Sequence, residues 1–187
     1  MSIKENTKII IKELLHNTQY QNDEELNELM TAVKEANHIF LAGSGRSGIA
    51  IRGFANRLLH LGFSVSVVGD VTNPHTQAGD LLMIGSGSGE TDSLVSMSKK
   101  AKENGVKIAL ITMDSKSTIS QLADVTVILP GVSPKLKNAG IDISSIQPGG
   151  SAFEQISFLT YDAIILELMK EYKETTGSMF ERHADLE

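Results

Sequence analysis

The sequence predicts an α/β protein, a three-layer α/β/α sandwich around a five-stranded parallel sheet. Short apolar segments alternate with longer segments of helical periodicity, as in parallel sheets that are buried on both faces. Glycine-rich turns follow the first and the third apolar segment, where a doubly wound sheet binds its ligand. The chain is therefore expected to form one domain over residues 1–187.

Two amphipathic helices are expected before the first strand, within residues 1–36. The first runs from Ser2 to about Gln19, and the second covers residues 23–36 with Asn22 or Asp23 as its cap. A parallel sheet does not need both helices as cover, so one of them is expected to pack against another subunit.

The α/β core is expected over residues 37–172. The predicted strands are 38–42, 64–68, 80–84, 107–112 and 125–129. One predicted helix follows the first glycine-rich turn and ends near residue 61, and three others cover 90–104, 117–122 and 151–172. Residues 130–150 show no sustained period, and a loop of that length is usually functional or mobile. The polar tail, residues 173–187, is expected near the active site without forming a core element.

Composition excludes several classes of protein. The chain has 17 basic and 23 acidic residues, a net charge of −6 and no basic run, so nucleic acid is not an expected partner. It has no cysteine, which excludes disulfides and thiol chemistry. No apolar run approaches the ~20 residues of a membrane span, and the N-terminus lacks the apolar segment of a signal peptide. A soluble, cytoplasmic protein without a membrane partner is expected.

The turn after the third strand is predicted to bind phosphate. Its residues are Gly85, Ser86, Gly87, Ser88, Gly89, Glu90 and Thr91. Backbone N–H groups and the positive end of a helix dipole converge at such a turn, and no lysine of a nucleotide-binding P-loop follows. A small phosphorylated molecule fits better than a nucleoside triphosphate. The alternative is that Ser88 only caps the helix, and Glu90 and Asp92 would repel an anion unless they point outward.

The turn after the first strand allows two interpretations. Gly43, Gly45 and Gly48 match the dinucleotide-binding fingerprint, with Asp70 near the position of a ribose-binding acid. However, both glycine-rich turns should face one crevice, between the first and third strands. One phosphorylated ligand held from two sides explains both turns, whereas a dinucleotide explains only the first.

Glu154 also has two interpretations. Ser151 and Glu154 match a capping box, which the sequence alone favours. The functional alternative is that this carboxylate projects into the crevice as a general base. Among the histidines, 16, 38 and 60 are expected in surface or packing positions, His75 has a weak claim on the crevice, and His183 lies in the polar tail, from which it could reach a neighbouring subunit.

Four motifs together resemble the sugar isomerase (SIS) domain family. They cover residues 43–48, 84–91, 147–155 and 179–187 and span nearly the whole chain. Within the family, the chain resembles most closely the isomerases that interconvert 3-hexulose 6-phosphate and fructose 6-phosphate, the step after formaldehyde fixation onto ribulose 5-phosphate. The resemblance implies a flavodoxin-like fold, a homotetramer, functional coupling to a 3-hexulose-6-phosphate synthase, and no metal or redox cofactor.

The resemblance also implies roles for single residues. The phosphate would be held by Ser47, Ser86, Ser88 and Thr91, with the Gly87 and Gly89 backbone assisting and Glu90 in the same loop. Glu154 would be the catalytic base, and His183 would assist proton transfer or ring opening. Arg46 and loop N–H groups are candidates for stabilising an enediolate. Another aldose–ketose phosphate isomerase and a non-catalytic sugar-phosphate sensor are the remaining alternatives.

Overall fold

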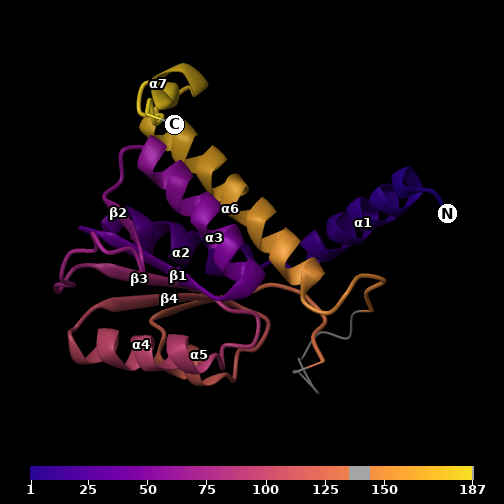
Figure 1. Cartoon of the computed structure of the whole chain (residues 1–187), viewed down its shortest axis with the longest axis horizontal. Coiled ribbons are helices and arrows are strands. Elements are labelled where there is room, and N and C mark those ends of the chain that lie inside the picture. The colour runs from indigo at the N-terminus through magenta and orange to yellow at the C-terminus, as the bar shows by residue number, and fades with distance from the viewer. Residues whose placement is uncertain (135–143, 187) are drawn as a thin grey trace.

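The computed structural model of the chain describes residues 1–134 and 144–186. Within these residues, five parallel strands form one sheet of order β2-β1-β3-β4-β5, which confirms the predicted flavodoxin-like topology. The strands are β1 (Ile39–Gly43), β2 (Val65–Val67), β3 (Leu81–Gly85), β4 (Lys107–Thr112) and β5 (Val125–Ile128). The strands are continuously apolar because helices cover both faces of the sheet (Figure 1).

Over the described residues, the predicted helices are all present in the expected order, the end of the first forms a separate 3₁₀ turn, and one further short helix is added. They are α1 (Ile3–Asn17), the 3₁₀ turn η1 (Thr18–Tyr20), α2 (Asp23–Glu35), α3 (Gly45–His60), α4 (Asp92–Glu103), α5 (Thr118–Leu122), α6 (Ser151–Tyr172) and α7 (Thr176–Phe180). Asn22 is the cap of α2. The addition is α7, which a capping box between Thr175 and Ser178 and the burial of Met179 stabilise.

Side chains of the central strands β1, β3 and β4 alternate between two separate cores. Ile39 and Leu41 of β1 face a core that α2, α3 and α6 cover, whereas Phe40 and Ala42 face a smaller core under α4 and α5. Figure 1 shows α4 and α5 on one side of the sheet and α3 and α6 on the other. This is the three-layer sandwich that the sequence predicts.

The strand order reverses between β1 and β3, so the chain leaves these two strands toward opposite faces. Gly43, which ends β1, pairs with Gly85, which ends β3. After Gly43 the chain enters α3 on one face, and after Gly85 it continues to α4 on the other. Such a divergence opens a crevice at the carboxyl edge of a parallel sheet, and both glycine-rich loops begin there.

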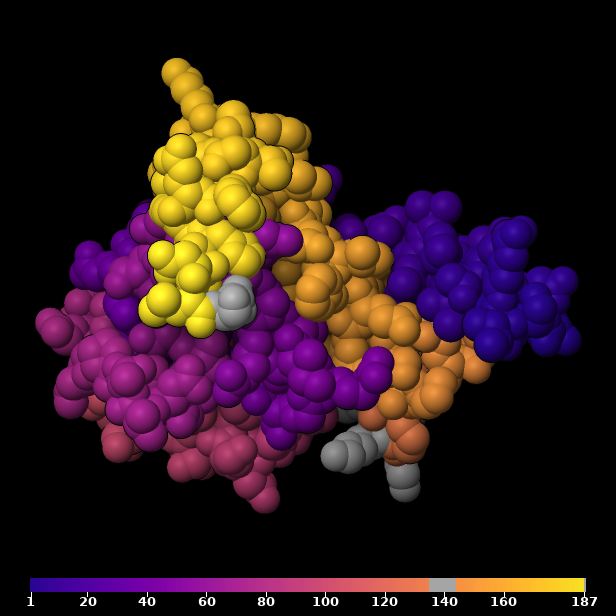
Figure 2. Space-filling view, turned by 45° about the horizontal axis from the view of Figure 1, so that its top comes forward, coloured from indigo at the N-terminus to yellow at the C-terminus, as the bar shows by residue number. Residues whose placement is uncertain are grey.

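Helix α1 projects from the body of the protein. Figure 2 shows α1 in indigo at one end and the yellow C-terminal tail on another part of the surface, with α6 in orange between them. Large apolar side chains remain exposed on these helices, namely Ile3, Ile11, Leu15, Phe158, Leu159 and Leu166. Over the described residues, no helix is long and apolar enough to cross a membrane.

The junction between β1 and α3 generates a prediction about stability. A Cβ atom at Gly48 would lie 2.7 Å from the Gly43 carbonyl oxygen, and this backbone cannot move without disturbing β1. We expect Gly48→Ala to lower the free energy of unfolding by about 1–3 kcal/mol, as overpacking does, measured by urea denaturation.

The matched control for this prediction is Gly105→Asn. Gly105 has a φ of +71° and open space around its Cα, and asparagine tolerates that backbone conformation better than other side chains do. The control should lose less stability. An equal loss in both variants would show that the close approach at Gly48 is not what requires glycine.

Candidate active site

An ion pair between Arg46 and Glu154 joins the first turns of α3 and α6. The Arg46 Nε–H group donates a hydrogen bond to Glu154 Oε2. The two helices lie side by side across one face of the sheet (Figure 1). The side chain of Glu154 is 17% exposed and that of Arg46 is 62% exposed. The carboxylate is thus sheltered while the guanidinium remains open to solvent.

The capping box that the sequence favours for Glu154 is not formed, so that interpretation was wrong. Gly150 occupies the N-cap position with a φ of 93°, and Ser151 is already the first residue of α6. The hydroxyl of Ser151 therefore lies one position too late to cap the helix. The Glu154 carboxylate is free of a capping role and turns to Arg46 instead.

Arg46 and Glu154 line a hollow of about 230 Å³. The other lining residues are Ile49, Ala50, Gln155 and Phe158. The Oε1 atom of Gln155 is buried and has no hydrogen-bond partner among the described residues. Sequence reasoning assigned no role to Gln155, although it directly follows Glu154 in the same motif. A buried amide oxygen without a donor is a candidate acceptor for a ligand hydroxyl.

The serines of the β3 loop hold the loop's own backbone. Ser86 is buried, and its Oγ accepts a hydrogen bond of 3.2 Å from the Gly89 N–H group. The Oγ of Ser88, which is half-buried, accepts a 3.3 Å bond from the Glu90 N–H group. The alternative that Ser88 caps the next helix was wrong, because α4 begins at Asp92 and its N-cap is Thr91.

The side chain of Glu90 points away from the loop. Its carboxylate accepts hydrogen bonds from the backbone N–H and the hydroxyl of Thr118, in the first turn of α5. A negative charge is favourable at a helix N-terminus. The structure therefore gives the Glu90 carboxylate a partner of its own, as the phosphate interpretation required.

Side-chain caps are distributed unevenly among the helices. Helices α1, α2, α5 and α7 are each capped by a side chain, from Ser2, Asn22, Ser117 and Thr175. Among residues 1–134 and 144–186, no side chain caps α3, α4 or α6. Arg46 and Ser47 lie at the start of α3, Thr91 lies at the start of α4, and Glu154 lies in the first turn of α6. Backbone N–H groups without a side-chain partner thus gather where the predicted site residues lie.

Phe153 connects the β3 loop to the start of α6. Its side chain is buried, and a Cβ atom added to Gly87 would lie 3.2 Å from its ring. The residue before Glu154 thus packs directly on the β3 loop. The structure thus joins the start of α3 to Glu154 through Arg46, and the β3 loop to the start of α6 through Phe153.

His183 lies elsewhere in the same chain. Its ring centroid is 5.0 Å from that of His60 and 5.6 Å from that of Phe180. His60 ends α3 and Arg46 begins it, which separates them by about 20 Å at 1.5 Å per residue. Within one chain, His183 and the tail therefore lie far from Glu154.

Asp70, the acid of the dinucleotide alternative, lies in an exposed ion pair with Arg52, 3.7 Å away. It follows β2, the edge strand of the sheet. The crevice between the β1 and β3 loops is on the other side of β1. Asp70 thus belongs to a different part of the carboxyl edge from Glu154 and the β3 loop.

Known proteins resemble the chain over nearly its whole length. It is 42% identical over 178 residues to the 3-hexulose-6-phosphate isomerase of Bacillus subtilis (strain 168), with 95% of both chains covered. It is 35% identical over 185 residues to the 3-hexulose-6-phosphate isomerase of Mycobacterium gastri, with 99% of this chain and 92% of that one covered.

A solved structure and a family agree with these relatives. The fold matches the crystal structure of a Methanococcus jannaschii protein for which a molecular function of 3-hexulose-6-phosphate isomerase was inferred. The TM-score is 0.83 at 33% identity, over 98% of this chain and 99% of that one. The family described as the SIS domain matches residues 32–154, from the end of α2 to Glu154. The chain belongs to the SIS domain family.

Proposed function

We propose that the chain is an isomerase that interconverts 3-hexulose 6-phosphate and fructose 6-phosphate through an enediol. The observation that carries this proposal is the Glu154 carboxylate, which is sheltered, is paired with Arg46 at the start of α3, and belongs to a helical turn that the β3 loop contacts through Phe153. The relatives named 3-hexulose-6-phosphate isomerase support the substrate. A carboxylate next to a phosphate cradle is what proton transfer on a sugar phosphate requires.

The phosphate is held by short-range donors. Ser47 at the start of α3 and Thr91 at the start of α4 contribute hydroxyl groups, and Ser88 does so from the loop between β3 and α4. Ser86 is buried, so it supports the loop that presents the Gly87 and Gly89 backbone. Glu90 contributes through its backbone, because its carboxylate lies at Thr118. The absence of side-chain caps on α3 and α4 supports this arrangement.

The reaction moves a ketone between adjacent carbons. Glu154 removes the proton from C2, the electron pair forms the C2=C3 double bond, and the C3 carbonyl becomes an enediolate oxygen. A proton then passes between the two oxygens, and Glu154 returns a proton to C3, which leaves the ketone at C2. Arg46 stabilises the enediolate, since a guanidinium offers donors where negative charge develops.

His183 assists this reaction from a neighbouring subunit. About 20 Å of α3 separates its surroundings from Arg46 in one chain, so a second copy has to bring it to Glu154. Exposed apolar side chains adjoin it, among them Leu166 and Phe180, which line the same hollow as His183. Exposed apolar surface of this kind is typical of contacts between subunits.

The protein assembles as a homotetramer, in which the exposed apolar faces of α1 and α6 contact other copies. It acts in the cytoplasm, where a 3-hexulose-6-phosphate synthase supplies its substrate.

Experiment distinguishes two alternative functions from this isomerase activity. Another aldose–ketose isomerase would turn over a different sugar phosphate, and a sensor would bind the sugar phosphate without turnover.

Glu154→Gln tests the base. The amide keeps the shape of the side chain but cannot take up the C2 proton, so we expect kcat to fall by about 10²–10⁴-fold. Ribulose 5-phosphate, formaldehyde and a hexulose-phosphate synthase supply the substrate, and coupling enzymes report fructose 6-phosphate as NADPH. Glu167→Gln on the exposed face of α6 is the matched control. Near wild-type turnover by a folded Glu154→Gln variant would contradict the role of the base.

Ser88→Ala tests the phosphate cradle. Loss of one hydrogen bond to a charged group is worth about 1.5–3 kcal/mol, so KM for the phosphorylated sugar should rise by roughly 10- to 100-fold. Ser93→Ala, an exposed position in the first turn of α4, should leave KM unchanged. If Ser88→Ala lowers the melting temperature and leaves KM alone, its hydroxyl only supports the Glu90 backbone.

Mixed oligomers test the origin of His183. Glu154→Gln and His183→Ala chains should each be nearly inactive alone. When they are co-expressed, a site with Glu154 from one copy and His183 from the other has both groups, so activity should return in the purified mixed oligomer. No recovery, with mixed oligomers verified by two affinity tags, would mean that both groups act within one chain.

A further inference from the structure

The C-terminal tail folds back onto α3 through a sharp reversal. Helix α6 ends at Tyr172, and its C-cap Lys173, with a φ of 57°, is the one non-glycine residue with positive φ in the described part of the chain. The Glu174 N–H group donates a 2.9 Å hydrogen bond to the Met169 carbonyl and closes the end of α6. This reversal sends the next residues toward the end of α3.

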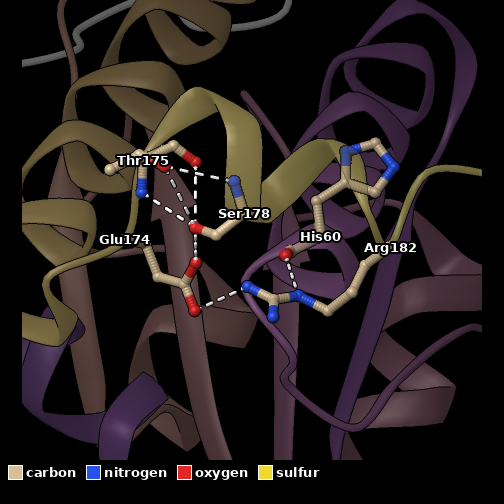
Figure 3. A network of polar contacts seen from close by, with 5 residues as sticks. All are labelled: His60, Glu174, Thr175, Ser178 and Arg182. Carbon is tan, nitrogen blue, oxygen red and sulfur yellow. Dashed lines mark hydrogen bonds and ion pairs between the residues drawn. The ribbon is translucent and has the colours of Figure 1, made fainter.

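A network of polar contacts then fixes the tail, as Figure 3 shows. The carboxylate of Glu174 accepts a hydrogen bond from the Ser178 hydroxyl and pairs with Arg182, with Oε1 and Nη2 2.6 Å apart. The Nε–H group of Arg182 donates to the backbone carbonyl of His60. We call Glu174, Ser178, Arg182 and the His60 carbonyl the tail clasp.

Arg182 satisfies a backbone carbonyl that the end of α3 leaves open. His60 is the last residue of α3, so no later residue of that helix reaches its carbonyl. The planar guanidinium of Arg182 contacts this carbonyl and the Glu174 carboxylate at the same time, which a lysine ammonium cannot do in this geometry. The side chains of Glu174 and Arg182 are 18% and 37% exposed, so solvent screens the pair only in part.

The tail clasp stays closed at neutral pH. Hydrogen bonds from Ser178 and Arg182 hold the pKa of Glu174 below its ordinary value of 4.5. A group whose pKa is lowered by folding stabilises the fold fully above its unfolded pKa and loses that contribution as the pH falls through the folded value. The ion pair in the tail clasp therefore weakens only when the pH falls below the ordinary carboxyl pKa of 4.5.

His183 directly follows Arg182, so the tail clasp decides where its imidazole lies. The ring contacts those of Phe180 and His60, at a hollow of about 420 Å³ that Arg57 and Asp162 also line. The His183 residue remains exposed. Its neighbours in the chain are thus fixed while its ring stays accessible from outside.

We propose that Arg182 is a positioning residue, which fixes the place from which His183 is presented to the active site of a neighbouring subunit. This inference rests on the proposed role of His183. A general acid or base works only within hydrogen-bond reach of its substrate, and a small misplacement costs a large factor in rate. A polar tail without a core of its own needs such a fixed point.

The test compares steady-state kinetics of the full-length oligomer. Arg182→Met should lower kcat roughly 10- to 100-fold and leave KM almost unchanged, because the phosphate is held at the other end of α3. Arg182→Lys keeps the ion pair with Glu174 and should lose less. Lys107→Met removes an exposed ion pair to Glu35 and should retain wild-type kcat, which controls for the loss of a surface charge.

Two further measurements separate positioning from a general loss of structure. The double variant Arg182→Met/His183→Ala should be no slower than His183→Ala alone, since the two residues act as one unit. Free imidazole should restore part of kcat to both His183→Ala and Arg182→Met. A merely structural role for Arg182 would give losses that multiply and no imidazole effect.

The outcomes distinguish this inference from the proposed function. If His183→Ala lowers kcat while Arg182→Met does not, or if the losses multiply, the positioning role is overturned and the proposed function stands. If His183→Ala keeps wild-type kcat, the role of His183 and the positioning by Arg182 are both overturned. The isomerase activity itself is decided separately by Glu154→Gln, which leaves the tail unchanged.

Discussion

The close approach of β1, β3 and α3 at the carboxyl edge of the sheet is the constraint on which the site depends. Gly43 and Gly85 are paired neighbours, and Gly48 packs on the Gly43 carbonyl. Without side chains at these positions, α3 begins directly at the strand end. Arg46 thereby lies beside the first turn of α6, and the β3 loop lies against Phe153. A bulkier junction would move α3 outward and separate Arg46 from Glu154.

Helix α3 carries this arrangement across the molecule. At its beginning it holds Arg46, and at its end its last carbonyl holds Arg182 of the tail. Phe54, in its middle, stacks on Tyr161 of α6, with ring centroids 4.9 Å apart, and burial raises the pKa of that tyrosine so that it stays neutral. The two helices thus form a rigid pair, with the carboxylate at one end and the imidazole at the other.

The sequence predicts the sheet well because its signals are local. Continuous apolar runs predict the positions of the strands, and the structure confirms the flavodoxin-like strand order that the resemblance implies. Helix starts at the site are harder to predict. Ser88 and Ser151 have the residue type of a cap, but positive φ at Gly89 and Gly150 shifts the backbone so that neither one caps its helix. The tail clasp joins residues 122 apart in sequence, Arg182 and His60, and no periodicity reports such a contact.

The distribution of charge explains what each part of the site can contribute. The chain has a net charge of −6, but salt screens charges that lie more than about 10 Å apart. Nearby donors therefore decide whether a phosphate binds.

The phosphate is the same in substrate, enediolate and product, and contacts that hold all three equally add nothing to kcat. Neutral hydroxyl and N–H groups are suited to that uniform task. The rate must come from groups whose interaction changes during the reaction, and for this task we propose Glu154 and its partner Arg46. In the proposed reaction, Glu154 takes up a proton and releases the Arg46 guanidinium just as the enediolate oxygen becomes negative.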